Sequence, residues 1–113
     1  MALDLQEIPI IDGHCHPPIR RQPRSLVEFK GFFTESRDPR IVSHHVQHTL
    51  FYQQSLRDLA SLMGLGDTVE PETVLARRSE YPLKDYLTLT VKQANIRGLV
   101  VDYGYRTGEA YDH

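Results

Sequence analysis

The sequence predicts an α/β chain in which two parallel strands flank a long helical segment. Two short apolar runs rich in β-branched residues lie at about residues 7–12 and 98–103, and helical patterns fill about residues 25–95 between them. The order of strand, helices and strand is typical of a right-handed crossover between parallel neighbours. We therefore expect two adjacent parallel strands joined by an enlarged helical insertion.

The first strand is expected at residues 7–12, Glu-Ile-Pro-Ile-Ile-Asp, where the apolar run ends at the turn-forming pair Asp12-Gly13. Pro9 has no amide to donate, so it suits the start or edge of a strand better than its centre. Residues 14–24 contain three prolines and three arginines and are expected to form a solvated loop.

The helical insertion opens with two capping patterns. Ser25 is expected to cap a short helix that ends near Phe33, with Glu28 as its capping-box partner. Asp38-Pro39 is expected to begin a long helix, because the Asp side chain can accept from free backbone amides and proline suits the first helical position.

Apolar residues near a 3.6-residue period extend that long helix to Gly64 and Gly66, which supply a left-handed end. A shorter helix is expected over about residues 71–78, and a third begins at Pro82. The unbroken apolar run that follows, at about residues 98–103, is typical of a strand covered on both faces of a parallel sheet.

Two histidines follow the first strand. In an extended segment alternate side chains share a face, so Asp12, His14 and His16 are expected on one side and Cys15 on the other, as a small buried residue. Imidazoles are common ligands of zinc and similar metals, and a catalytic site takes about three protein ligands and one open position. We therefore predict that His14 and His16 bind a metal ion. Asp12 is expected either to orient a histidine through its second ring nitrogen or to approach the metal.

Residues 10–16, Ile-Ile-Asp-Gly-His-Cys-His, resemble the Asp-x-His-x-His signature that ends the first strand in the amidohydrolase superfamily. Residues 93–105 resemble the end of the first helical layer and the second strand of its amidohydrolase-related branch, whose members often insert helices between these strands. The resemblance implies that residues 1–113 are an incomplete N-terminal segment of a TIM (β/α)8 barrel, because such a barrel needs roughly 200 residues or more.

The same resemblance implies a metal-dependent hydrolase in which His14 and His16 are ligands of a divalent metal ion, zinc first and manganese or iron as alternatives. A metal-activated water would attack a C–N or ester bond of a small-molecule substrate. The other ligands and the general base belong to later strands, so the chain alone is expected to be inactive. Some members of the superfamily are decarboxylases or lyases, and that alternative stays open.

Asp102 and Tyr103 end the second predicted strand, at the barrel face where active sites gather. A role toward substrate or toward a metal ligand is one interpretation of Asp102. Ordinary turn chemistry before Gly104 is the other.

Rival interpretations start from other residues. His44 and His48 are four residues apart in the long predicted helix, but a metalloprotease motif requires Glu directly after the first histidine and position 45 is His. TatD-like nucleases and histidinol-phosphatase-type phosphoesterases also open with close histidines, although the insertion of about 80 residues argues against both. A non-catalytic, truncated helical interaction module is the remaining alternative.

The composition sets further bounds. Thirteen basic and fifteen acidic residues are interspersed, so no nucleic-acid partner is expected. No apolar stretch reaches the roughly 20 residues of a membrane span and no signal peptide opens the sequence, which favours a cytoplasmic protein without a membrane partner. No organic cofactor is predicted, and a homo-oligomer formed through the insertion or the open strand edge is left open.

Overall fold

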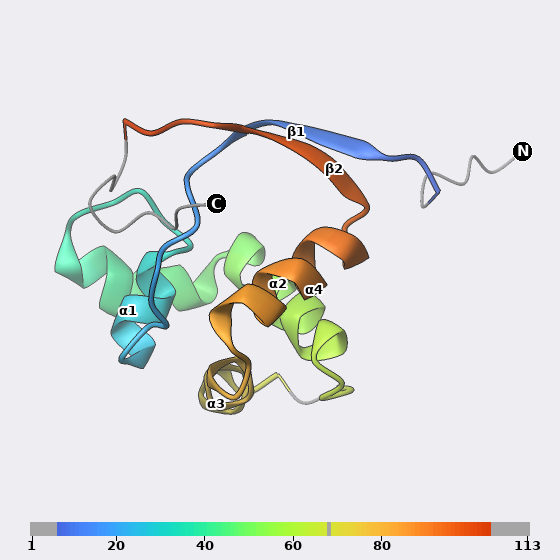
Figure 1. The fold of residues 1–113 in the computed structure, drawn as a ribbon. Coiled ribbons are helices and arrows are strands. Elements are labelled where there is room, and N and C mark those ends of the chain that lie inside the picture. Colours follow the sequence, from blue (N-terminus) through green and yellow to red (C-terminus); the bar gives the residue numbers. More distant parts are fainter. Residues whose placement is uncertain (1–6, 68, 105–113) are drawn as a thin grey trace, which may run out of the picture. The chain divides into compact units, whose positions relative to one another are not determined.

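The computed structural model describes residues 7–67 and 69–104. The chain divides into two compact units. The strand unit contains the described residues up to Gln22 and from Pro82 onward, and the helical unit spans Pro23–Tyr81. Along the chain a first strand is followed by a series of helical elements and then by a second strand (Figure 1).

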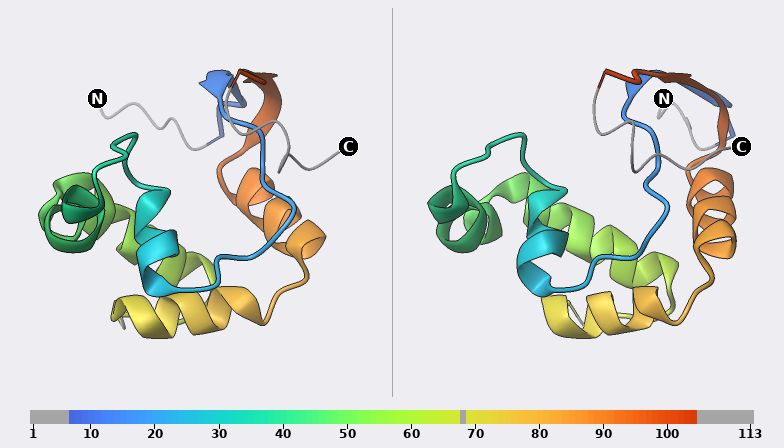
Figure 2. Two further views of the ribbon diagram at one scale, coloured as in Figure 1. Left: turned by 90° about the vertical axis from the view of Figure 1, so that its left-hand side faces the viewer. Right: turned by 60° about the vertical axis from the view of Figure 1, so that its left-hand side comes forward.

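The strand unit contains two parallel strands, β1 (Ile10–Cys15) and β2 (Ile96–Val101). They run side by side in both views of Figure 2. The ladder is extended at both ends, because the Ile10 amide donates to the Asn95 carbonyl at 2.9 Å and the Asp102 amide donates to the Cys15 carbonyl at 2.8 Å. The two expected strands are therefore present and parallel, while the complete barrel stays a prediction.

The predicted bounds of the first strand were wrong by three residues. β1 begins after Pro9, as the missing proline amide requires, and then continues through Gly13 to Cys15. Asp12-Gly13 is therefore not the turn that ends the strand, contrary to the prediction. The histidine motif instead begins inside the paired strand, and β2 likewise begins two residues earlier than predicted, at Ile96.

Helix α4 (Leu83–Gln93) starts after Pro82, as predicted, and leads directly into β2. Its end depends on Asn95, which has a positive φ of 50°. Asparagine is one of the few residues other than glycine that adopt this conformation readily, and it commonly terminates helices for that reason. Asn95 therefore ends the helix and begins the sheet within one residue, a role that the sequence analysis missed.

The helical unit begins with α1 (Leu26–Gly31), which is capped as predicted although it ends before Phe33. The Ser25 hydroxyl accepts from the Glu28 amide at 3.2 Å. The Glu28 carboxylate accepts in turn from the Arg24 amide at 2.7 Å, one residue earlier than in the usual capping box.

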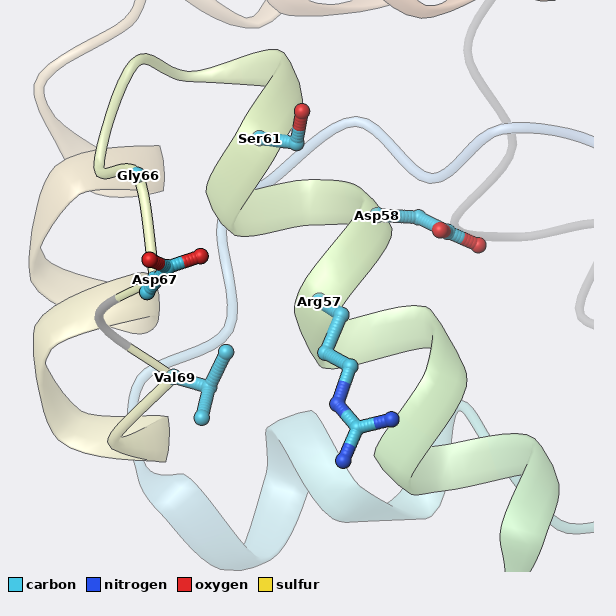
Figure 3. Close-up of a pocket in the computed structure, with 6 residues that line it drawn as sticks. All are labelled: Arg57, Asp58, Ser61, Gly66, Asp67 and Val69. Atoms are coloured by element: carbon cyan, nitrogen blue, oxygen red, sulfur yellow. The ribbon is translucent and has the colours of Figure 1, made fainter.

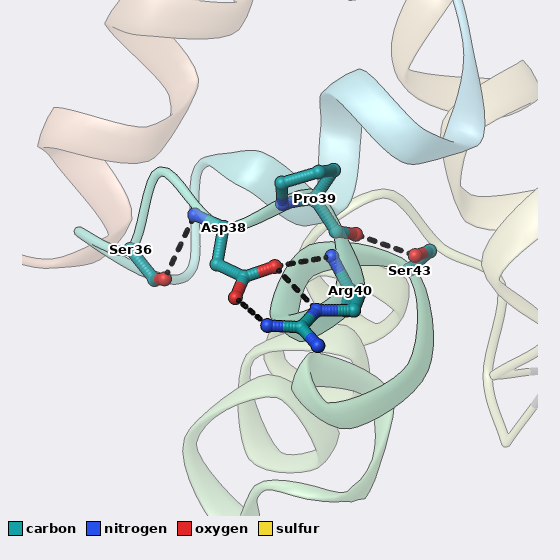
Figure 4. Close-up of polar contacts among 5 residues, drawn as sticks. All are labelled: Ser36, Asp38, Pro39, Arg40 and Ser43. Atoms are coloured by element: carbon teal, nitrogen blue, oxygen red, sulfur yellow. Dashed lines mark hydrogen bonds and ion pairs between the residues drawn. The ribbon is translucent and has the colours of Figure 1, made fainter.

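Asp38 starts the next helical segment as predicted. Its carboxylate accepts from the Arg40 amide at 2.9 Å and from the Arg40 guanidinium at 2.8 Å (Figure 4). Hydrogen bonds from the Arg40 side chain and then from its amide lower the pKa of Asp38 below its ordinary value. The Ser43 hydroxyl donates to the Pro39 carbonyl in the same turn, an arrangement that tends to bend helices.

The prediction of one long helix from Pro39 to Gly64 was wrong. A π-helical turn, η1 (Ile41–His45), and a 3-10 turn, η2 (Val46–His48), precede the regular helix α2 (Leu50–Leu62). The break is at Thr49, which is extended with φ −79° and ψ 143° and whose hydroxyl oxygen accepts from the Tyr52 amide at 3.2 Å. Threonine favours this capping role over a helix interior, where its branched side chain loses freedom.

The predicted left-handed end of α2 is confirmed. Gly64 has φ 74°, the Leu65 amide donates to the Ala60 carbonyl at 2.8 Å, and the Gly64 amide donates to the Ser61 carbonyl at 3.1 Å. These two bonds define a Schellman motif, which satisfies carbonyls that the helix leaves unpaired. Helix α3 (Pro71–Ser79) follows and agrees with the segment predicted at residues 71–78.

Most of the buried side chains belong to the helical unit. Phe33 packs edge-to-face with Phe29 and with Tyr52, at ring-centroid distances of 5.2 and 5.1 Å. In the described part of the chain, the buried residues of this unit are Pro23, Phe29, Val46, Tyr52, Leu56, Ala60, Met63, Val74 and Arg78.

The strands, by contrast, expose their apolar side chains. Ile11 is 72% exposed and Val100 is 56% exposed, so the burial expected from their sequence is not observed. Apolar residues on both strands of a parallel pair are typical of a sheet that other layers cover. Across residues 7–67 and 69–104, no helix is long and apolar enough to cross a bilayer.

Candidate metal centre

His14 and His16 form a pair at the C-terminal end of β1. Their rings are edge-to-face, with centroids 5.8 Å apart and an interplanar angle of 76°. Two imidazoles that bind one tetrahedral metal through bonds of about 2.1 Å have ring centres about 5 Å apart. Both side chains are exposed. The centroid separation of the two rings is therefore close to that of two imidazoles bound to one metal ion.

The sheet register shows an irregularity inside the motif. Asp12 pairs with Leu99 and Cys15 pairs with Val101, so β1 advances three residues while β2 advances two. An extra residue of this kind defines a β-bulge. Leu99 and Val101 are two residues apart and share one face of β2, so their partners Asp12 and Cys15 share that face as well.

The bulge corrects the expected alternation of side chains over residues 12–16. Asp12 and Cys15 are both partly buried, whereas His14 and His16 are exposed. The two histidine rings lie close to each other, with centroids 5.8 Å apart. The register therefore places Asp12 on the face of Cys15, whereas the sequence analysis expected these two residues on opposite faces.

Asp12 contacts the backbone of the motif. Its Oδ1 atom accepts a hydrogen bond from the His14 amide at 3.1 Å. This bond closes the chain around Gly13, where the extra residue is accommodated, and so helps to fix the local conformation that presents the two rings.

The surroundings of Cys15 disfavour the thiolate form of its side chain. Burial raises the pKa of its thiol above the ordinary value, and the negative charge of Asp12 raises that pKa further. The thiolate is the form that binds metals and attacks electrophiles, so both effects disfavour the reactive form. The charge effect of Asp12 also agrees with the shared face that the register assigns to these two residues.

Asp102 and Tyr103 directly follow β2. The Asp102 Oδ1 atom accepts from the Gly104 amide at 2.8 Å, which is the turn chemistry considered in the sequence analysis. A Cβ atom at Gly104 would lie 3.0 Å from that oxygen, so the turn favours glycine there. Tyr103 is 53% exposed.

The two histidines have no third ligand beside them in the described ranges. Within residues 7–67 and 69–104, no three His, Cys, Asp or Glu side chains come together in a way that could hold a metal ion. The described residues thus offer two candidate ligands, whereas a catalytic metal site takes about three.

His44 and His48 do not lie on one face of a regular α-helix, as their four-residue spacing predicts. His44 belongs to the π-helical turn η1 and His48 to the 3-10 turn η2, so the four-residue step does not place them on one face of a regular α-helix. Both side chains are exposed, and the ring Nε2 of His48 lies 3.3 Å from the Gln47 side-chain amide. These residues form a polar surface of the helical unit.

A surface hollow of about 570 Å³ lies in the helical unit between the second half of α2 and the segment before α3 (Figure 3). The Asp58 carboxylate at its rim accepts from the Gln54 side chain at 2.8 Å. No histidine or cysteine lines the hollow, and its described lining residues are Arg57, Asp58, Ser61, Gly66, Asp67 and Val69.

The chain matches no family model, no curated protein and no solved structure. The amidohydrolase resemblance of residues 10–16 and 93–105 therefore stays a prediction.

Proposed function

We propose that the protein is a metal-dependent hydrolase of the amidohydrolase type, with His14 and His16 as metal ligands of its first strand. The observation that carries this proposal is the histidine pair, with ring centroids 5.8 Å apart at the C-terminal end of β1. Active sites of parallel α/β enzymes gather at the C-terminal ends of their strands. The chemistry of the pair and its place in the sheet support the same function.

Each residue of the motif has a separate task in this proposal. His14 and His16 hold a divalent metal ion, zinc first and manganese or iron as alternatives. Such an ion supplies Lewis-acid chemistry, polarising the scissile group of a C–N or ester bond and lowering the pKa of water. Asp12 holds the His14 backbone at 3.1 Å and keeps the bulge in place. The exposed position of both rings leaves access for a small-molecule substrate.

The remaining ligands and the general base belong to further strands of the barrel. The exposed apolar side chains of β1 and β2 support this, since Ile11 and Val100 suit a sheet with covering layers. The chain by itself therefore binds metal weakly and does not turn over substrate. The proposal also places the protein in the cytoplasm, without a nucleic-acid or membrane partner.

Zinc titration of the purified chain by calorimetry tests the proposal. The double variant His14→Ala/His16→Ala should lose at least about tenfold in zinc affinity, because both proposed ligands are gone. The matched control His44→Ala/His48→Ala removes two other exposed histidines and should retain the affinity. Binding that disappears in the control, or persists in the first variant, would contradict the proposal. A chain that binds no zinc, manganese or iron would also contradict it and would favour the non-catalytic helical module.

A further inference from the structure

The helical unit has a break at Thr49, between η2 and α2, and specific hydrogen bonds hold it. The Thr49 hydroxyl donates to the Val46 carbonyl at 2.8 Å and accepts from the Tyr52 amide at 3.2 Å. The Gln53 side-chain amide donates to the Gln47 carbonyl at 2.7 Å. These bonds satisfy backbone groups that the end of one helix and the start of the next leave unpaired. A π-helical and a 3-10 turn precede the break, and such turns often mark a hinge.

The broken arrangement leaves a large apolar side chain in water. Leu50 is 82% exposed, whereas Val46, four residues earlier, is 1% exposed. Residues four apart lie on one face of an α-helix, so a helix that continued through Thr49 would bring Leu50 beside the buried Val46. Removing an apolar side chain from water is favourable. Hydrophobic burial therefore favours a continuous helix, in opposition to the capping bonds of Thr49.

Three histidines lie near the end of the helical piece that precedes the break. His44 and His45 end η1, His48 ends η2, and all three residues are exposed. Carbonyl groups at the C-terminal end of a helix carry partial negative charge, which stabilises cations there. In a continuous helix the same residues would lie in its N-terminal half, away from that charge. Protonation of the three imidazoles therefore favours the broken arrangement.

The charged groups on the surrounding elements do not reverse this sign. Helix α1 packs against η1 and carries Glu28 and Lys30, which are of opposite charge. Helix α2 packs against η2 and carries no charged residue before Arg57. Asp38 and Arg40 precede η1 and form an ion pair with each other at 2.8 Å. Since opposite charges accompany each other on α1 and before η1, the position of the histidines relative to the helix ends decides the effect of protonation.

We propose that the segment from Pro39 to Leu62 is a pH-sensitive switch between a broken and a continuous helix. Histidine is the side chain that ordinarily changes charge between about pH 5 and pH 8. At the acid end of this range the three imidazolium groups stabilise the break at Thr49. At the alkaline end their charge is lost, so the burial of Leu50 shifts the population toward the continuous helix. The switch does not depend on the proposed metal site.

The backbone of Thr49 reports the switch directly. Its ψ of 143° gives a Cα chemical shift of the extended type, whereas a continuous helix gives a helical value. NMR of the complete chain at low salt should show this shift moving toward the helical value from pH 5 to pH 8. The ratio of continuous to broken helix should rise by about 5- to 150-fold, the effect of three charges at a helix end. The variant His44→Gln/His45→Gln/His48→Gln should lose this pH dependence.

Leu50→Pro gives a locked form of the break. Proline suits the first position of α2 but disfavours a helical residue before it, so the extended conformation of Thr49 is kept and a continuous helix is prevented. The Thr49 shift in this variant should keep its extended value at every pH. His14→Gln/His16→Gln is the matched control and should retain the pH dependence. A Thr49 shift that is constant with pH in the unmodified chain would overturn the proposal, as would a move toward the helical value that persists in Leu50→Pro or in the triple histidine variant.

Discussion

Tyr52 is the largest side chain in the structure that is completely buried, with 0% of its surface exposed. Its ring packs edge-to-face against Phe33, but its hydroxyl has no hydrogen-bond partner among the described residues. A buried hydroxyl without a partner costs about 1–3 kcal/mol. Burial, and then the charge of Glu72, raises the pKa of Tyr52 above its ordinary value.

The variant Tyr52→Phe should therefore be more stable by about 1 kcal/mol at neutral pH, since the unpaired hydroxyl is removed and the ring is kept. The advantage should grow at high pH. The folded chain holds the phenolic proton more tightly than the unfolded chain, whose tyrosines titrate near pH 10. The protonated Tyr52 phenol thus favours the folded state below about pH 10. This contribution to the free energy of unfolding is lost as the pH rises through the pKa that Tyr52 has in the folded chain.

Urea denaturation followed by circular dichroism from pH 7 to pH 11 measures this prediction. Tyr103→Phe is the control, because Tyr103 is 53% exposed and its hydroxyl has access to water. A variant Tyr52→Phe that is less stable than the unmodified chain would show that the hydroxyl has a partner after all. Stability curves that run parallel above pH 10 would show that Tyr52 does not titrate differently on folding.

The extent of each helix is determined mainly by the residues at its ends. The Schellman motif of α2 depends on Gly64, whose φ of 74° lies in a region that most residues occupy only with strain. The same principle applies at Asn95, where a φ of 50° ends α4 and places the next residue in β2. These ends determine where the chain leaves each helix and hence which residues can pair in the sheet.

Gly64→Ala should lower the free energy of unfolding by about 1–2 kcal/mol, because alanine at positive φ is strained even though nothing lies within 4 Å of the added Cβ atom. Gly31→Ala is the matched control. A Cβ atom at Gly31 also meets nothing within 4 Å, and Gly31 ends α1 without a positive φ. Its change should be neutral or stabilising by up to about 1 kcal/mol. Equal effects in thermal denaturation would exclude backbone strain as the cause.

For the molecule as a whole, the core and the candidate site belong to different units. The buried aromatic and aliphatic residues of the helical unit pack together, whereas the strand unit carries the histidine pair beside exposed apolar side chains. Regions with few buried apolar contacts open at low free energy. Much of the stability of the chain should thus come from the part that does not carry the proposed ligands.

A fragment spanning residues 23–81 should accordingly fold by itself and unfold cooperatively, since domains of about 55–65 residues can do so with a modest core. Circular dichroism and thermal melting of this fragment test the prediction. Hydrogen exchange of the complete chain gives a second test, in which amides of α2 should be protected longer than those of β1 and β2. A fragment without helical structure, or strands protected more strongly than α2, would contradict it.

Much of the local structure was predictable because it depends on a few neighbouring residues. Ser25 caps α1, Gly64 ends α2 and Pro71 begins α3, each through bonds or backbone angles within one turn. The break at Thr49 was not predicted. An apolar period continues across it, and only the capping bond to the Tyr52 amide shows that the helix starts anew.

The sequence by itself determined two parallel strands around a helical segment, and it predicted His14 and His16 as a metal-binding pair. The structure decided which residues of the motif share a face. Strict alternation put Asp12 and Cys15 on opposite faces, but the paired register inserts an extra residue between them and places both on one face. A bulge arises from pairing with a strand whose residues are 86 or 87 positions away in the sequence, so local periodicity cannot contain it.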